Sequence, residues 1–347
     1  MNVTKIKNVF VMPLVLLIFV LPGCRNITQA REPEQEYLAA AMGFDRGEDD
    51  LLEVTLEVIV FSVGEAENSI ESRLFTGTGH TVKEAVGNLS GGVAKTVLFS
   101  HCALLVLGEN LSAGQVDEVF RFCTTERNIS ISTVVATAPD AGELLSCESI
   151  STPITAYDIT GVLQQKRRDW GISLANRLHE VEAGRLNTKS FALPYFTVEK
   201  KDEKNSYSLH GVRIYEKDLP SLTLDLTGSA FYSLLSGSFK SGSFYFEADG
   251  TVYQPEVRHY SSKVRTPAGT NEIEINIRLI LEKERYSMTD TDALKTALEK
   301  AADDFFNTVT AACRTDVFNI RKRAGLDDVP GEFSNVKIRF DVKERPG

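Results

Sequence analysis

The sequence predicts an α+β, multi-domain fold in which mixed β-sheets are packed by helices. Several short segments alternate apolar and polar residues, which is typical of strands with one face toward water. Other segments place apolar residues every three or four positions behind a helix-capping residue, which is typical of amphipathic helices. Together the two patterns indicate sheets that are covered by helices.

Strand and helix patterns alternate through an N-terminal α/β region, which we assign to residues 37–199. In chain order these patterns cover residues 52–60, 81–89, 102–107, 112–123 and 129–138. Glu53, Thr55 and Glu57 give the first strand a polar face, whereas the apolar run 102–107 predicts a central strand covered on both faces. Capping residues begin both helices. This order predicts a mixed sheet.

The last part of this region has a less regular pattern, and whether the region is one domain or two is left open. Proline-containing turns near 139–153 allow a split there. A helix is predicted through residues 159–184 and a strand over 191–198. The next residues, 200–205, are charged and poor in apolar side chains, which is typical of a boundary between domains.

Residues 206–344 are predicted to form a C-terminal α+β domain. Three strand patterns lie here, over 209–215, 273–281 and 336–342. Glycine- and serine-rich turns between the first two strands predict hairpins, at Ser236-Gly237, Ser241-Gly242 and Asp249-Gly250. One long helical pattern precedes the last strand, with Asp290 or Thr291 as its N-cap. Its apolar stripe needs a sheet to cover, so we expect an antiparallel-rich sheet with one long helix.

The first residues, 1–23, are predicted to be a signal peptide. Two lysines precede a thirteen-residue apolar run that ends at Leu21. As a helix this run rises about 20 Å, too little to cross a bilayer core of about 30 Å. Leu21 and Gly23 precede Cys24 and resemble the lipobox of bacterial lipoproteins, whose cysteine is lipidated before cleavage. The alternative is a secreted protein with an incidental cysteine. Residues 24–36 are polar and are predicted to be a lipidated N-terminal tether.

The composition is that of a globular protein, with 42% hydrophobic and 25% charged residues. A net charge of −10 argues against a surface that binds nucleic acid or anionic lipid, because both partners need a basic field. No second apolar stretch approaches the roughly 18 residues of a membrane span. Lipid at Cys24 is therefore the predicted membrane anchor.

The chain has four further cysteines: Cys102, Cys123, Cys147 and Cys313. No two of them are close enough in sequence to form a CxxC motif. The sequence therefore supports neither a zinc site nor a redox dithiol. Cys123 and Cys313 continue helical apolar patterns and are predicted to be small core residues. A structural disulfide stays an open alternative in an exported protein.

We predict no catalytic residue, no metal ligand and no cofactor. Five histidines are scattered without an HxH or HExxH spacing, and no serine lies in a GxSxG elbow. Gly77 and Gly79 stand before a helix as in a dinucleotide-binding loop, but Val82 occupies the place of the third glycine. The residues therefore favour a protein that is not an enzyme.

Five segments, in this order and spacing, carry a resemblance to a known family. They are the lipobox and residues 38–45, 79–86, 99–109 and 316–318. The set resembles the Ger(x)C family, the lipoprotein C subunits of spore nutrient germinant receptors, over almost the whole mature chain. Two places depart from the family pattern. Arg25-Asn26 stand where Trp-Asp is common, and Asn319-Ile320 replace an expected glycine-containing stretch.

The resemblance implies a non-enzymatic receptor subunit, attached by lipid at Cys24 to the outer surface of the spore inner membrane. It also implies two partners, the receptor A subunit and a permease-like B subunit, and a role in signalling germination. The alternative function is a solute-binding lipoprotein of a transporter, which predicts two similar lobes around a cleft. A lipid-anchored enzyme is a third possibility, for which no catalytic set is found.

Overall fold

The computed structural model describes residues 36–63, 68–89, 96–126, 128–149, 151–172, 176–201, 204–267, 272–282, 290–326 and 335–344. The chain divides into two compact units, Met1–Glu36 and Tyr37–Gly347. Apart from its first residue, every element described below lies in the second unit.

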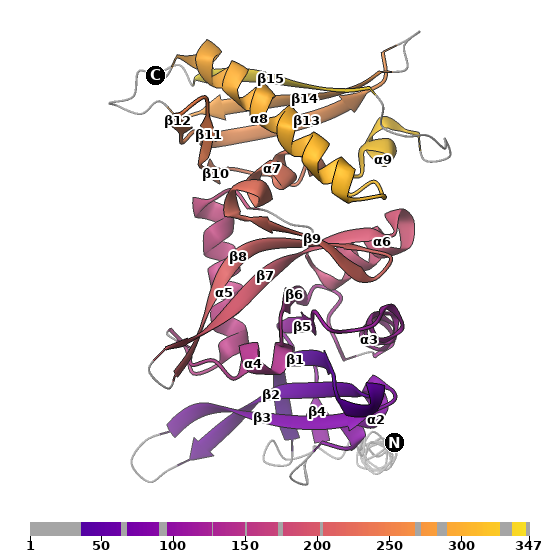
Figure 1. Ribbon diagram of the computed structural model, residues 1–347. Helices are drawn as coiled ribbons and strands as arrows, with labels where there is room; N and C mark the ends of the chain where they lie inside the picture. The colour runs from indigo at the N-terminus through magenta and orange to yellow at the C-terminus, as the bar shows by residue number, and fades with distance from the viewer. Residues whose placement is uncertain are drawn as a thin grey trace, which may run out of the picture. The chain divides into compact units, whose positions relative to one another are not determined.

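The larger sheet has nine strands within the described residues (Figure 1). They are β1 (Glu36–Arg46), β2 (Leu52–Val63), β3 (Asn68–Gly79), β4 (Thr96–Leu98), β5 (Leu104–Gly108), β6 (Val134–Ala138), β7 (Ser190–Lys201), β8 (Lys204–Glu216) and β9 (Leu219–Asp225). The spatial order is β3-β2-β1-β5-β6-β7-β8-β9, and β4 also pairs with β1. The three central pairs are parallel: β1 with β5, β5 with β6, and β6 with β7. The outer pairs, β3 with β2, β2 with β1, β7 with β8 and β8 with β9, are antiparallel. The predicted mixed sheet is therefore confirmed.

Helices cover both faces of this sheet. They are α2 (Val82–Gly87), α3 (Ala113–Thr125), α4 (Ala141–Leu145), α5 (Thr155–Asp169) and α6 (Leu178–Thr188), and a short 3-10 turn, η2 (Glu48–Asp50), joins β1 to β2. One core takes residues from α2, α3 and α6, and a second core takes residues from α4 and α5. Alternate residues of β5 enter the two cores, so the prediction of a central strand covered on both faces is confirmed.

The capping residues predicted for the first two helices are confirmed. The Thr81 hydroxyl accepts a hydrogen bond from the Glu84 backbone N–H at the start of α2. Ser112 and Gln115 form a complete capping box at the start of α3. The polar face predicted for the strand over 52–60 is present in β2, but α4 and α5 cover that face, so its residue Glu57 is buried rather than exposed to water.

Two sequence predictions in the middle of the chain need correction. The helix predicted through 159–184 is two helices, α5 and α6, because the segment between them leaves the helical path at Gly171, whose φ is +61°. The proposed boundary at 200–205 falls between β7 and β8, which are antiparallel neighbours in the large sheet. The strand predicted over 209–215 therefore belongs to that sheet, and the division into separately folding domains stays a prediction.

The smaller sheet has four strands within the described residues. They are β10 (Gly242–Ser243), β13 (Glu256–Arg265), β14 (Ile273–Leu281) and β15 (Val336–Glu344), in this spatial order. Only the β14–β15 pair is parallel, so the antiparallel-rich sheet is confirmed. Helix α8 (Thr291–Ala312) is the predicted long helix, and Asp290 is its N-cap.

Other elements complete this part of the chain. Helices α7 (Leu226–Ser236) and α9 (Ile320–Ala324) join α8 in the same hydrophobic core. The hairpin predicted at Asp249-Gly250 is present between β11 (Phe246–Ala248) and β12 (Thr251–Tyr253). The turn at Ser236-Gly237 instead ends α7, because Gly237 adopts the left-handed conformation of a helix C-cap.

Candidate functional site

The predicted lipid-attachment residues, Leu21, Gly23 and Cys24, lie outside the described residues. The described chain begins at Glu36, twelve positions after Cys24. No helix in the described ranges has both the length and the apolar character needed to cross a membrane. The lipid anchor at Cys24 therefore stays a prediction.

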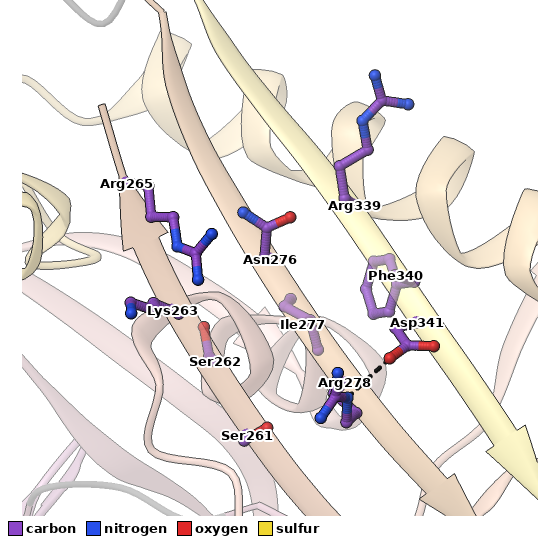
Figure 2. Close-up of a pocket in the computed structure, with 10 residues that line it drawn as sticks. All are labelled: Ser261, Ser262, Lys263, Arg265, Asn276, Ile277, Arg278, Arg339, Phe340 and Asp341. Carbon is purple, nitrogen blue, oxygen red and sulfur yellow. Dashed lines mark hydrogen bonds and ion pairs between the residues drawn. The ribbon is translucent and has the colours of Figure 1, made fainter. Parts of the chain in front are cut away.

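The smaller sheet has one apolar face and one polar face. Alternate residues of β14, such as Ile275 and Ile277, are buried in the core that contains α8. The residues between them, Asn276 and Arg278, point to the opposite face, because side chains alternate along a strand. Figure 2 shows this opposite face, where polar side chains from three neighbouring strands surround a hollow of about 660 Å³.

Cations dominate this polar face. Glu274 also lies on this face, directly opposite Arg265. The hollow itself is lined by Lys263 and Arg265 from β13, Arg278 from β14, Arg339 from β15 and one carboxylate, Asp341. We call these five residues the basic sheet face. All four cations are exposed, and the face stands out because the chain as a whole carries a net charge of −10.

Only part of the basic sheet face is neutralised internally. The Arg278 Nε donates to Asp341 Oδ2 at 2.7 Å, and this hydrogen bond lowers the pKa of the Asp341 carboxyl. Lys263 and Arg265 form no ion pair with any described residue. Exposed guanidinium and ammonium groups of this kind bind carboxylates and phosphates. The basic sheet face can therefore bind an anionic partner surface.

The same face offers little for chemistry. Ser262 alternates with Lys263 along β13, so its hydroxyl lies toward the other face, where it accepts a hydrogen bond from Arg323 Nη2 at 2.6 Å. Among the described residues, no group of histidine, cysteine, aspartate or glutamate side chains could hold a metal ion. Within the described residues, this face presents cations that can bind anions.

Two of the segments that carry the family resemblance meet at a buried carboxylate. β1 and β5 are parallel neighbours, and their ends place Asp45 beside Gly108. The Asp45 carboxylate, 4% exposed, accepts hydrogen bonds from the backbone N–H groups of Ala141 (2.9 Å) and Gly142 (3.0 Å) at the start of α4. Burial raises the pKa of this carboxyl to about 6. A side chain at Gly108 would overlap the carboxylate, so only glycine fits there.

A second buried carboxylate holds helix α5. Glu57 on β2 is 0% exposed and accepts hydrogen bonds from the backbone N–H groups of Thr155 (2.6 Å) and Ala156 (2.8 Å). The N-cap residue of α5, Ile154, has no side chain that can cap the helix. Glu57 therefore supplies the cap from the sheet. Burial raises the pKa of its carboxyl, although the hydrogen bonds favour the charged form.

The last segment of the resemblance, residues 316–318, also has a structural role. The Asp316 carboxylate accepts hydrogen bonds from the backbone N–H groups of Ile320 (2.9 Å) and Arg321 (2.8 Å) at the start of α9. Asn319 adopts a left-handed conformation, with φ of 54°. Glycine and asparagine tolerate this conformation best, so asparagine preserves the backbone geometry where the family pattern has a glycine-containing stretch.

The four described cysteines are free and buried: Cys102, Cys123, Cys147 and Cys313. The prediction that Cys123 and Cys313 are core residues is confirmed. Burial raises the pKa of all four thiols. The alternative of a structural disulfide is not found among them.

The described parts do not match the alternative prediction of two similar lobes. One sheet has nine strands of mixed direction, and the other has four strands with a single parallel pair. A solute-binding lipoprotein is therefore not favoured by the architecture.

A comparison with protein families agrees with the resemblance found in the sequence. Residues 29–198 match the family model described as the spore germination protein N-terminal domain. A crystal structure of the GerBC protein is similar over 88% of this chain and 96% of that chain, with 14% sequence identity and a TM-score of 0.45. No curated protein matches the chain. Residues 29–198 of this chain therefore form a spore germination protein N-terminal domain, which agrees with the resemblance to the Ger(x)C family.

Proposed function

We propose that this protein is a non-enzymatic lipoprotein subunit of a spore nutrient germinant receptor, held at the outer surface of the spore inner membrane by lipid on Cys24. It assembles with the receptor A subunit and the permease-like B subunit and is needed for the germination signal. The single observation that carries the proposal is the match of residues 29–198 to the spore germination protein N-terminal domain. The lipobox immediately before that match supports attachment to the membrane.

A lipid on Cys24 makes weak contacts with membrane partners sufficient for assembly. The eleven residues between Cys24 and Glu36 let these two positions separate by at most about 40 Å when fully extended. The folded part is thereby confined close to the bilayer, where its effective concentration toward integral partners is high. Loss of the lipid therefore removes much of the free energy of assembly without changing any protein contact.

Replacing Cys24 with alanine is expected to release the protein from the spore inner membrane and to reduce the germination response strongly. The measurement is membrane fractionation of spores, with the nutrient response of the same spores followed in parallel. Asn26→Ala, two positions away in the tether, is the matched control and is expected to behave as wild type. A Cys24→Ala protein that stays in the membrane with a full response contradicts the role of the lipid.

The basic sheet face is the surface that we assign to partner contact. Reversing two of its unpaired cations, with Lys263→Glu and Arg265→Glu together, is expected to weaken binding to the A and B subunits by roughly ten-fold at low salt. Co-purification at several salt concentrations measures this. Lys83→Glu with Lys295→Glu, on α2 and α8, makes the same change in charge at two exposed lysines that form no ion pair with a described residue, and is the control. If the A and B subunits co-purify equally with the Lys263→Glu, Arg265→Glu variant and with the control variant at every salt concentration, the assignment is contradicted.

A further inference from the structure

Among the described residues, no strand pairs with the outer edge of β3. β3 is the last strand of the nine-stranded sheet and, among the described strands, pairs only with β2. An open edge presents unpaired N–H and C=O groups, and proteins usually protect it with proline, lysine, a bulge or a covering element. Helix α2 packs closely on one end of β3, where a Cβ at Gly77 would lie 2.3 Å from the Ala85 carbonyl oxygen. Residues 70–74 lie beyond this contact and have no proline, lysine or bulge.

Large apolar side chains are exposed on this uncovered part. Ile70 is 49% exposed and Leu74 is 38% exposed, and both project from the same face of β3 because they are four residues apart. Phe61 on β2 lies directly opposite Ile70 and is 61% exposed. Such a group of exposed apolar side chains beside an open strand edge is typical of an interaction surface.

We propose that β3 pairs with β3 of a second copy of this chain, antiparallel and with Ser72 at the centre of the register. The large sheet would then continue across the two copies through a twofold axis. In this register Ile70 lies opposite Leu74 of the second copy, and the same pair occurs again on the other side of the axis. The exposed apolar groups are thereby brought together on one face.

The charges on β3 select this register over its neighbours. Glu71 and Arg73 are both exposed and form no ion pair within the described part of the chain. In a twofold-symmetric pairing, the axis must pass through one residue of β3, which then lies opposite itself in the second copy. Any other register would place the upper face of one copy beside the lower face of the other, because side chains alternate along each strand. A register centred on Glu71 places two glutamates opposite each other, and one centred on Arg73 places two arginines opposite each other. Centring on Ser72 instead pairs Glu71 with Arg73 of the second copy, twice.

The contact is small, so it is expected to be weak in solution. Its strength at the membrane rests on the proposed function, since lipid on Cys24 would confine both copies to one surface and raise their effective concentration. The pairing itself needs no lipid. Failure of the anchor therefore appears in membrane fractionation, whereas failure of the pairing appears in solution with the Cys24→Ala chain.

The test is sedimentation equilibrium of the Cys24→Ala chain over a range of protein concentrations. The expected result is a monomer–dimer equilibrium. Arg73→Glu is expected to weaken the dimer roughly ten- to thirty-fold, because two attractive cross-strand pairs become repulsive. The double exchange Glu71→Arg with Arg73→Glu restores both pairs and is expected to return the dissociation constant to within about three-fold of the starting chain. Lys295→Glu, exposed on α8, is the matched control for charge.

Two results would overturn the proposal. One is a chain that remains monomeric at every concentration reached. The other is a dimer whose dissociation constant does not distinguish Arg73→Glu from Lys295→Glu, which would place the contact on another surface. Circular dichroism of each variant verifies that the fold is intact, and Ile70→Ser provides a second, uncharged variant that is also expected to weaken the dimer.

Discussion

Replacing Asp45 with alanine is expected to lower the free energy of unfolding by about 2 kcal/mol at pH 7, because two buried N–H groups at the start of α4 lose their acceptor. Part of that loss is offset, since the variant no longer buries a charged carboxylate. Urea unfolding of the purified chain measures the change. Asp140→Ala removes the exposed N-cap of the same helix and is expected to cost about 1 kcal/mol.

The cost of removing Asp45 depends on pH in a defined direction. Its pKa is about 6 in the fold against the ordinary value of 3.8 for an aspartate, so the folded state binds the proton more tightly. Its protonation therefore stabilises the fold below pH 3.8, and this contribution is lost as the pH rises through 6. Between pH 7 and pH 5 the wild-type chain is expected to gain about 1 kcal/mol relative to both Asp45→Ala and Asp45→Asn. A stability difference that is the same at both pH values contradicts the raised pKa.

The sequence predicted those strands and helices that are determined by residues close together in the chain. β14 and β15 alternate cleanly because only one face of the smaller sheet is buried, and the capping residues Thr81, Ser112 and Asp290 mark the starts of three helices. β1 was missed because its middle is buried on both faces, which leaves a continuous apolar run without a period of two. α7 was missed because it too is buried nearly all round.

Features that depend on tertiary contacts could not be predicted in this way. The charged segment at 200–205 has the composition of a linker, yet it lies between two strands that pair with each other. The basic sheet face was also missed, because Lys263, Arg265, Arg278 and Arg339 come from three strands that only the fold brings together. Alternation around Ile275 and Ile277 was the available signal, since it placed Arg278 on the uncovered face.

The buried carboxylates explain why polar residues occur in the family segments although no chemistry is found there. Asp45 is the last residue of one segment, and Gly108 lies near the end of another. Their contact fixes the start of α4 on the sheet. Conventional motif searches look for polar residues that act on a ligand, whereas these polar residues act on helix N-termini, where a negative charge is favourable.

Replacing Glu57 with alanine is expected to have the larger effect of the two carboxylate substitutions, a loss of about 3 to 4 kcal/mol in the free energy of unfolding. Glu57 is fully buried, and a hydroxyl of Ser72 donates to it in addition to the two N–H groups of α5. Helix α4 keeps a local N-cap at Asp140 when Asp45 is removed, whereas Ile154 leaves α5 without any other cap.

Two further variants distinguish the loss of the helix cap from the loss of side-chain volume in the core. Glu57→Gln keeps the volume but offers one amide oxygen and a donor that faces other donors, so it is expected to cost about 2 kcal/mol. Glu53→Ala, on the same strand, removes a carboxylate that caps no described helix and is expected to stay within about 0.5 kcal/mol of wild type. The urea midpoints of the three variants measure this order. If Glu57→Ala unfolds at the same midpoint as Glu53→Ala, then α5 does not depend on a cap from β2, and packing alone holds it on the sheet.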